Sequence, residues 1–116
     1  MASINIKRAY EPKGKSDGFR ILVDRLWPRG IKKEAAHVDV WLKEIAPSNE
    51  LRKWFNHEAE KWEAFNKKYA AELKTSPALE ELLALVKKHA IITLVYSAKD
   101  EQHNQAAALK AFIEKT

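Results

Sequence analysis

Two short segments of the chain concentrate side chains that could bind an anion or transfer a proton. Residues 24–30 (DRLWPRG) contain Arg25 and Arg29, and residues 96–104 (YSAKDEQHN) contain acidic, basic and histidine side chains. Guanidinium groups bind phosphate or carboxylate through paired hydrogen bonds, while carboxylate and imidazole groups act as general acids and bases. Together the two segments predict a polar pocket for a small anionic ligand.

Each polar or aromatic side chain of the first segment has both a functional and a structural interpretation. Arg25 and Arg29 clamp a phosphate or carboxylate, or else Arg25 forms a salt bridge with a neighbouring aspartate. Asp24 acts as a general base or orients an arginine. Trp27 stacks on a nucleobase or sugar, or packs beneath a helix.

The second segment has the pattern of a helix start. Ser97 and Asp100 resemble an N-cap and an acidic first-turn residue of a helix that begins near Asp100. His103 and Asn104 then fall in the first turn, where side chains point back over the helix N-terminus and toward the predicted pocket. His103 is therefore the best candidate for acid–base chemistry, with an ordinary surface histidine as the alternative.

These considerations define the candidate site. The candidate acid–base residues are Asp24, Asp100 and His103. The candidate ligand-binding residues are Arg8, Tyr10, Arg25, Trp27, Arg29, Tyr96, Ser97, Lys99 and Asn104. We expect no metal and no cofactor, because the four histidines lack metal-ligand spacing and no phosphate-loop or dinucleotide glycine pattern is present.

The elements that must position these residues are predicted from apolar periodicity. Strands are expected at residues 4–10, 19–26 and 90–96. Apolar stripes at helical spacing are expected to form helices around residues 38–45, 51–55, 62–73, 79–86 and 106–113. This order predicts an α/β fold in which about five helices cover a small, largely parallel sheet of about three strands.

Such a fold also predicts where the two polar segments lie. In open α/β sheets, ligands bind beyond the carboxyl ends of the strands. Residues 24–30 follow the second predicted strand and residues 96–104 follow the third. If these strands are parallel, both segments face one mouth.

The charge distribution agrees with an anionic partner. The 116 residues form one predicted domain, 1–116, with 21 Lys and Arg against 16 Asp and Glu, a net charge of +5. Residues 1–33 hold nine basic and three acidic side chains, a net +6, so the rest of the chain is close to neutral. Four of the five arginines lie in that basic third, and arginine is the residue suited to bidentate anion recognition.

Composition excludes several classes of protein. The absence of cysteine excludes a disulfide framework, thiol catalysis and iron–sulfur clusters. The longest apolar run, residues 90–96, is too short to span a membrane, and the first residues lack the apolar stretch of a signal peptide. We therefore expect a cytoplasmic protein without a membrane partner.

The same two segments carry a resemblance to a known family. Residues 17–30 (DGFRILVDRLWPRG), residues 93–100 (TLVYSAKD) and the pair His103-Asn104 occur in an order and spacing that closely resembles the YeaO-like proteins. These small bacterial proteins are a branch of the domain-of-unknown-function family 488. The resemblance implies a bacterial, cytoplasmic α/β domain, and it implies no particular reaction.

Three functions remain open from the sequence. The first is a pocket for a small phosphorylated or nucleotide-like anion, with or without enzymatic turnover. The second is a nucleic-acid-binding module, in which a basic strip tracks the phosphate backbone. That strip comprises Lys7, Arg8, Lys13, Lys15, Arg20, Lys32 and Lys33. The third is a protein-interaction domain that uses an aromatic helical face around Trp41, Trp54 and Trp62.

Overall fold

The computed structural model describes residues 2–115 and has an α/β architecture. Within these residues, four strands form one sheet: β1 (Ser3–Arg8), β2 (Phe19–Leu22), β3 (Val40–Trp41) and β4 (Ile91–Tyr96). The α-helices are α1 (Lys33–Ala36), α2 (Asn49–Phe55), α3 (Trp62–Lys74), α4 (Pro77–Lys88) and α5 (Gln105–Lys115). Three short 3-10 helices are η1 (Lys15–Asp17), η2 (Lys43–Ile45) and η3 (Ala59–Lys61).

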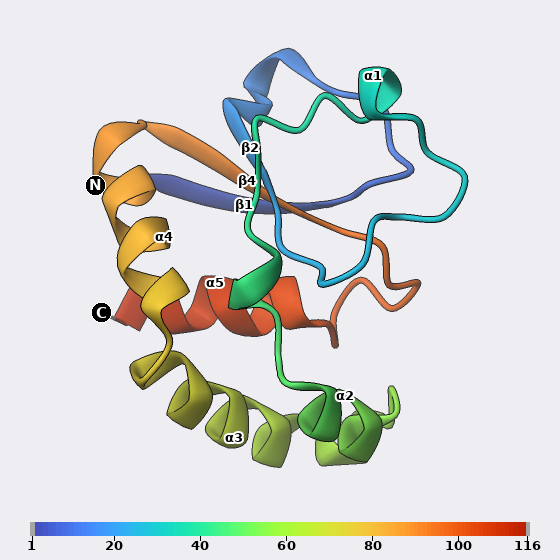
Figure 1. Ribbon diagram of the computed structural model, residues 1–116, viewed down its shortest axis with the longest axis vertical. Helices are drawn as coiled ribbons and strands as arrows, with labels where there is room; N and C mark the ends of the chain where they lie inside the picture. Colours follow the sequence, from blue (N-terminus) through green and yellow to red (C-terminus); the bar gives the residue numbers. More distant parts are fainter. Residues whose placement is uncertain (1, 116) are drawn as a thin grey trace.

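The sheet has the strand order β1-β4-β2-β3, and each neighbouring pair is parallel (Figure 1). β4 lies between β1 and β2, pairing with β1 from Ser3–Ile91 to Arg8–Tyr96 and with β2 from Phe19–Ile92 to Leu22–Val95. Because the strands are parallel, the carboxyl ends of β1, β2 and β4 share one edge of the sheet. The segments that follow them therefore meet there, as the sequence predicts.

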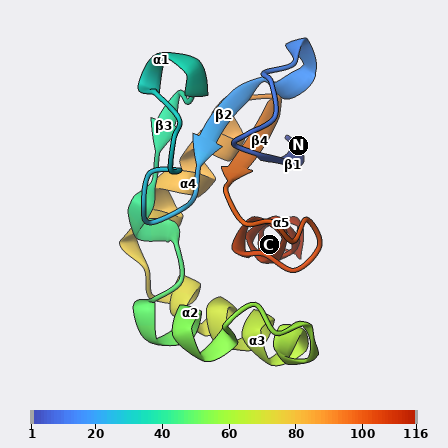
Figure 2. The ribbon, with the colours of Figure 1, turned by 90° about the vertical axis from the view of Figure 1, so that its right-hand side faces the viewer.

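One face of the sheet packs on the main hydrophobic core. Figures 1 and 2 show α5 between the sheet and the α2–α3 layer, with α4 at the side. Phe65, Tyr69 and Leu73 recur every four residues along α3, so all three point into this core. The start of α2 is fixed by Ser48, whose hydroxyl accepts a hydrogen bond from the Leu51 amide at 3.1 Å.

The opposite face of the sheet is covered by the segment that connects β2 to β3. Leu22 and Val95 are fully buried on this face. Four apolar side chains from the connecting segment and β3 cover them: Trp27, Ile31, Val38 and Trp41. With helices on one face and this segment on the other, β4 is buried on both sides, which accounts for its continuous apolar sequence.

A buried cluster of charged side chains lies on this second face. Arg20, on β2, is only 1% exposed. Its guanidinium group forms a close ion pair with the Asp17 carboxylate and donates hydrogen bonds to the backbone carbonyls of His37 at 3.0 Å and Ala36 at 3.1 Å. Asp17 also pairs with Lys7 Nζ of β1 at 3.0 Å. The cluster joins β1, η1, β2 and the connecting segment.

The predicted helix around residues 38–45 is wrong. Val40 and Trp41 form the edge strand β3, and a 3-10 helix follows. Their pairing with β2 is extended by the amides of Asp39 and Leu42, which donate to β2 carbonyls at 2.9 and 3.0 Å. These donors are therefore not available to a helix, and the sheet gains a fourth strand. The predicted α/β class with a largely parallel sheet is confirmed.

The boundaries of the other strands also differ from the prediction. β1 ends at Arg8 rather than residue 10, and β2 ends at Leu22 rather than residue 26. One further ladder-like hydrogen bond follows each strand, from Ala9 N to the Tyr96 carbonyl at 2.6 Å and from Val23 N to the Val95 carbonyl at 3.0 Å. Beyond these bonds the backbone segments after the strands diverge and form the loops at the carboxyl edge of the sheet.

The buried cluster predicts a large effect of Asp17→Asn on stability. Arg20 would keep its charge without a counter-ion, so the free energy of unfolding at pH 7 should fall by about 3–5 kcal/mol, measured by urea denaturation. Lys15→Gln changes an exposed side chain of the same 3-10 helix and should stay within about 0.5 kcal/mol. A loss for Asp17→Asn no larger than that of the control would contradict a structural role.

The same carboxylate predicts a dependence of stability on pH. Burial alone would raise the pKa of Asp17, but hydrogen bonds from the Gly14 amide, Lys7 and Arg20 outweigh burial and lower it. A carboxyl pKa lowered by folding stabilises the protein above the unfolded-state pKa of about 3.9, and this stabilisation is lost as the pH falls through the folded pKa. Asp17→Asn should reduce the acid-side slope of unfolding free energy against pH. An unchanged slope would argue against this coupling.

Candidate functional site

A cleft of about 650 Å³ lies at the carboxyl edge of the sheet. It is lined by residues 24–29 after β2, by parts of the loop after β4 and the start of α5, and by residues of the α2 region. Tyr10, just beyond β1, also lines it. The structure thus brings together the two polar segments that the sequence singles out, and it adds a third wall from α2.

The cleft carries an excess of cationic groups. Arg25, Arg29 and Arg52 line it. Among the residues described, Asp24 is the one acidic side chain of the lining, and it is only 7% exposed. A concave surface with several guanidinium groups and one buried carboxylate favours an anion.

Arg25 forms part of the wall and holds its position through weak contacts. Its Nη2 donates to the carbonyls of Ala46 at 3.2 Å and Pro47 at 3.3 Å, and Nη1 lies 3.8 Å from the exposed Glu44 carboxylate. The expected alternative, a salt bridge to a neighbouring aspartate, is thus replaced by a distant contact with a glutamate. Arg25 Nε is buried and has no hydrogen-bond partner among the described residues.

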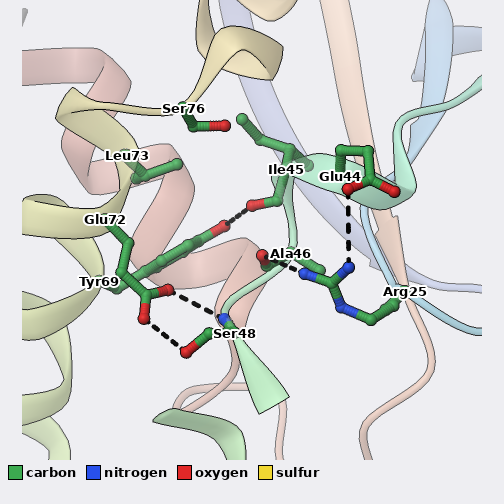
Figure 3. A pocket seen from close by; sticks show the side chains of 9 residues that line it. All are labelled: Arg25, Glu44, Ile45, Ala46, Ser48, Tyr69, Glu72, Leu73 and Ser76. Atoms are coloured by element: carbon green, nitrogen blue, oxygen red, sulfur yellow. Dashed lines mark hydrogen bonds and ion pairs between the residues drawn. The ribbon is translucent and has the colours of Figure 1, made fainter. Parts of the chain in front are cut away.

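A smaller pocket of about 170 Å³ lies on another side of Arg25 (Figure 3). The Tyr69 hydroxyl donates to the Ile45 carbonyl at 2.6 Å, and burial raises the pKa of Tyr69, which keeps it a donor. The Glu72 carboxylate accepts hydrogen bonds from the Ser48 amide at 2.9 Å and from its hydroxyl at 2.6 Å. These groups satisfy one another, so they anchor residues 45–48 and thereby the carbonyls that hold Arg25.

Asp24 connects the ends of β2 and β4. Its Oδ2 accepts hydrogen bonds from Ser97 N at 2.9 Å and Ser97 Oγ at 2.6 Å, and its Oδ1 forms a close contact with Gln105 Nε2. Burial raises the pKa of Asp24, and the hydrogen bonds from Ser97 and Gln105 oppose that rise. The expectation that Asp24 orients an arginine is therefore not met, because its side-chain partners are a serine and a glutamine.

The predicted start of the last helix is wrong. α5 begins at Gln105, and its N-cap contact comes from Asn104, whose Oδ1 accepts a hydrogen bond from the Ala107 amide at 2.8 Å. Ser97, the expected cap, instead directs its hydroxyl to Asp24. α5 begins too far along the chain for Ser97 to accept from its first-turn amides, and the Ser97 hydroxyl donates to Asp24 at the strand ends instead.

Asp100 and His103 form a hydrogen-bonded pair in the loop before α5. The Asp100 Oδ1 accepts the amides of Gln102 and His103, both at 2.9 Å, and Oδ2 lies 3.0 Å from His103 Nδ1. The backbone hydrogen bonds from His103 and Gln102 lower the pKa of Asp100. The His103 ring contacts the edge of Trp62 and lines the cleft, whereas Asp100 does not line it. His103 thus occupies the predicted pocket from a loop rather than from a helix.

Arg8 and Tyr10 form a second fixed pair, at the end of β1. Arg8 Nε donates to the Ala98 carbonyl at 2.9 Å and Nη2 to the Ser97 carbonyl at 3.2 Å, so Arg8 anchors the loop after β4. Its guanidinium carbon lies 5.0 Å from the centre of the Tyr10 ring. The Tyr10 hydroxyl donates to the Arg29 carbonyl at 3.0 Å.

The remaining predicted ligand-binding residues lie in different surroundings. Trp27 donates its Nε1 hydrogen to the Ile31 carbonyl at 2.6 Å and packs edge-on against Trp41, although part of it lines the cleft. Tyr96 is buried in the main core and lies outside the cleft lining. Lys99 is exposed and also lies outside the lining.

The α2 wall of the cleft was not predicted from the sequence. Arg52 and His57 line the cleft together with Asn49. The chain turns after α2 at Asn56 and His57, whose φ angles are both positive, at 47° and 56°. Arg52 is the fifth arginine, separated from the basic third, and this isolation is the one signal that could have identified it.

Several residues invoked for the nucleic-acid-binding and protein-interaction functions have partners within the protein. Lys7, Arg8 and Arg20 of the basic strip are bound to internal carboxylates or carbonyls. Of the three tryptophans, Trp41 packs on the second sheet face, Trp62 packs against Phe65 in the main core, and Trp54 is exposed. Three of the seven side chains of the basic strip thus make contacts within the protein, and Trp41 and Trp62 pack in different clusters.

The described residues also bear on metal and membrane binding. Within residues 2–115, no group of three or more His, Asp or Glu side chains could hold a metal ion. No helix of the same residues combines the length and apolarity required to cross a membrane.

These features define the class of protein: a small α/β protein with a cationic cleft at the carboxyl ends of a parallel sheet. Residues 3–116 match a family described as the inactive DUF488-N3 subclade, and the chain belongs to the YeaO-like DUF488 family. The uncharacterised protein YeaO of Escherichia coli (strain K12) is 49% identical over 107 residues, which cover 92% of this chain and 93% of that protein.

A second relative extends the comparison to another bacterial genus. An uncharacterised protein of Mycobacterium tuberculosis (strain ATCC 25618 / H37Rv) is 40% identical over 106 residues, which cover 91% of this chain and 89% of that protein. No solved structure matches the chain.

The contact between Ser97 and Asp24 predicts a measurable change in a carboxyl pKa. Ser97→Ala removes the hydroxyl donor and leaves the amide donor, so the pKa of Asp24 should be higher than in the wild type. The pKa is measured by NMR titration of the Asp24 carboxyl carbon. Ser16→Ala, at an exposed position in η1, serves as the control and should leave it unchanged. A pKa that stays constant or falls in Ser97→Ala would contradict this assignment.

Proposed function

We propose that the cleft binds a small phosphorylated ligand through Arg25, Arg29 and Arg52. The observation that carries the proposal is the set of three arginines that line one cleft, in which Asp24 is the one acidic residue among those described. The Asp24 oxygens accept hydrogen bonds from Ser97 and Gln105, so Asp24 does not pair with these arginines. A phosphate group would supply acceptors for the guanidinium donors and neutralise the cationic excess.

The dimensions of the cleft support a small molecule. Its volume of about 650 Å³ lies within the range of about 300–1,000 Å³ that is typical of small-molecule sites. Its lining combines guanidinium groups with aromatic side chains, among them Tyr10 and Trp27. Such a mixture provides charge for one part of a ligand and apolar contact for another.

Binding without turnover is favoured over catalysis. The oxygens of Asp24 accept hydrogen bonds from Ser97 and Gln105, and those of Asp100 contact Gln102 and His103. A carboxylate whose oxygens are occupied in this way is poorly placed to accept a proton from a ligand, and the lowered pKa of Asp100 makes it a weaker base. The description of the matching family as an inactive subclade agrees with a binding protein.

The proposal predicts that cleft arginines determine affinity for a phosphate compound. Arg25→Gln and Arg52→Gln should each weaken binding of inorganic pyrophosphate by about tenfold or more, because each loses charge-assisted hydrogen bonds. The affinity is measured by isothermal titration calorimetry at low salt. Arg52 is exposed in α2, so its replacement should leave the fold intact if Arg25→Gln proves unstable.

Lys33→Gln is the matched control, since it removes one positive charge from an exposed position in α1, outside the cleft lining. Its effect should be small, because a distant exposed charge is largely screened. Equal weakening by Lys33→Gln and by the arginine variants, or no binding to the wild type, would contradict the proposal. Tight binding of a generic oligonucleotide with a steep salt dependence, reduced by lysine substitutions, would favour the nucleic-acid function instead.

A further inference from the structure

Tyr10 is the aromatic side chain of the cleft whose surroundings best suit contact with a flat ligand group. Its side chain is 48% exposed. It also lines the cleft that contains the arginines. We infer that Tyr10 is a stacking surface for a planar ring, so that the phosphorylated ligand is a nucleotide, an inference that rests on the proposed function.

The ring is fixed in place by contacts at two positions. Its hydroxyl is bound to the Arg29 carbonyl at 3.0 Å, and the Arg8 guanidinium group lies over the ring at 5.0 Å from its centre. Arg8 is itself held by the carbonyls of Ser97 and Ala98. A ligand that stacks on a side chain already held in this way loses little affinity to side-chain ordering.

The contact with Arg8 also indicates which side of the ring is available. Arg8 does not belong to the cleft lining, whereas Tyr10 does. Because the guanidinium group covers one face of the ring, a planar ligand group would stack on the opposite face. Leu26, which is also strongly exposed, lines the same cleft and offers a further apolar surface to a flat group.

The other aromatic residues of the site are less suitable. Trp27 is engaged by the Ile31 carbonyl and by the edge contact with Trp41. Phe55 and Phe65 line the cleft, but both are buried and stack on each other with ring centres 4.4 Å apart. Tyr10 is the aromatic residue of the lining that combines a large exposed surface with a fixed orientation.

The position of Tyr10 links ring binding to anion binding. Its hydroxyl contacts the backbone of Arg29, a residue that lines the same cleft. A ligand with a planar ring at one end and a phosphate at the other matches this pair of surfaces. Stacking on an aromatic side chain does not discriminate strongly among bases, so the inference concerns nucleotides as a class.

Two probes that differ only in the base test this inference. Adenosine 5′-monophosphate and ribose 5-phosphate are titrated into the wild-type protein by calorimetry. Base stacking on an aromatic side chain should make the wild type bind the nucleotide about tenfold more tightly. Tyr10→Leu should abolish this preference while leaving the affinity for ribose 5-phosphate unchanged.

Two variants separate the ring from other effects. Tyr10→Phe retains the ring and loses the hydroxyl contact with Arg29, so it should keep most of the preference for the nucleotide. Trp54→Leu removes a partly exposed aromatic side chain outside the cleft lining and should keep all of it. Circular dichroism and thermal unfolding show whether each variant is folded.

The outcomes distinguish the inference from the proposed function. If the wild type binds ribose 5-phosphate and the nucleotide equally well, or if Tyr10→Leu keeps the preference, stacking on Tyr10 is refuted and phosphate binding stands. If the wild type binds neither probe nor pyrophosphate, both fail. A preference lost equally in Tyr10→Leu and Trp54→Leu would also overturn the assignment to Tyr10.

Discussion

The burial of one guanidinium group, that of Arg20, is the constraint on which this fold depends. A charge that is 1% exposed destabilises the protein unless its donors are satisfied, and here Asp17 and the carbonyls of residues 36–37 satisfy them. The Asp17 carbonyl in turn accepts the Thr93 hydroxyl of β4 at 2.7 Å, and its carboxylate binds Lys7 of β1. Three strands and the segment that covers the second sheet face are therefore held by one polar cluster. These contacts add side-chain links to the backbone pairing of β1, β4 and β2.

Two buried aspartates at opposite ends of β2 have opposite electrostatic surroundings. Asp17, before the strand, is paired with Arg20 and Lys7, and although burial alone would raise its pKa, hydrogen bonds from the Gly14 amide, Lys7 and Arg20 lower it. Asp24, after the strand, receives hydrogen bonds from the neutral side chains of Ser97 and Gln105, and burial raises its pKa. The first aspartate neutralises internal cations, whereas the second joins two strand ends and neutralises none. Asp24 therefore does not neutralise the arginines that line the cleft.

The sequence predicted the parts of this structure that depend on local pattern. The continuous apolar run of β4 indicated a strand buried on both faces, and the polar segments after β2 and β4 meet at one edge because the strands are parallel. β3 could not be predicted, since two paired residues leave no periodicity of their own and Trp41 also fits a helical stripe. The cleft wall formed by Arg52 depends on the packing of α2, a tertiary contact without a local signal. The role of Ser97 was misjudged for a related reason, because its acceptor, Asp24, lies 73 residues away in the chain.

The arginines of this protein differ in how fully their guanidinium donors are bound by acceptors of the protein itself. This difference, rather than charge density, distinguishes structural arginines from those suited to a ligand. Arg8 and Arg20 both lie in the basic N-terminal third, and both direct their guanidinium groups to backbone carbonyls or a carboxylate of the protein itself. Arg25 lies in the same third and also donates to backbone carbonyls, but through longer contacts, and it lines the cleft, as does Arg52 outside that third. Because Arg8 and Arg20 are engaged within the protein, a count of basic residues overstates the charge that the basic third presents to a partner. Arg25, Arg29 and Arg52 line one concave site, and the proposal of a small anionic ligand rests on this arrangement.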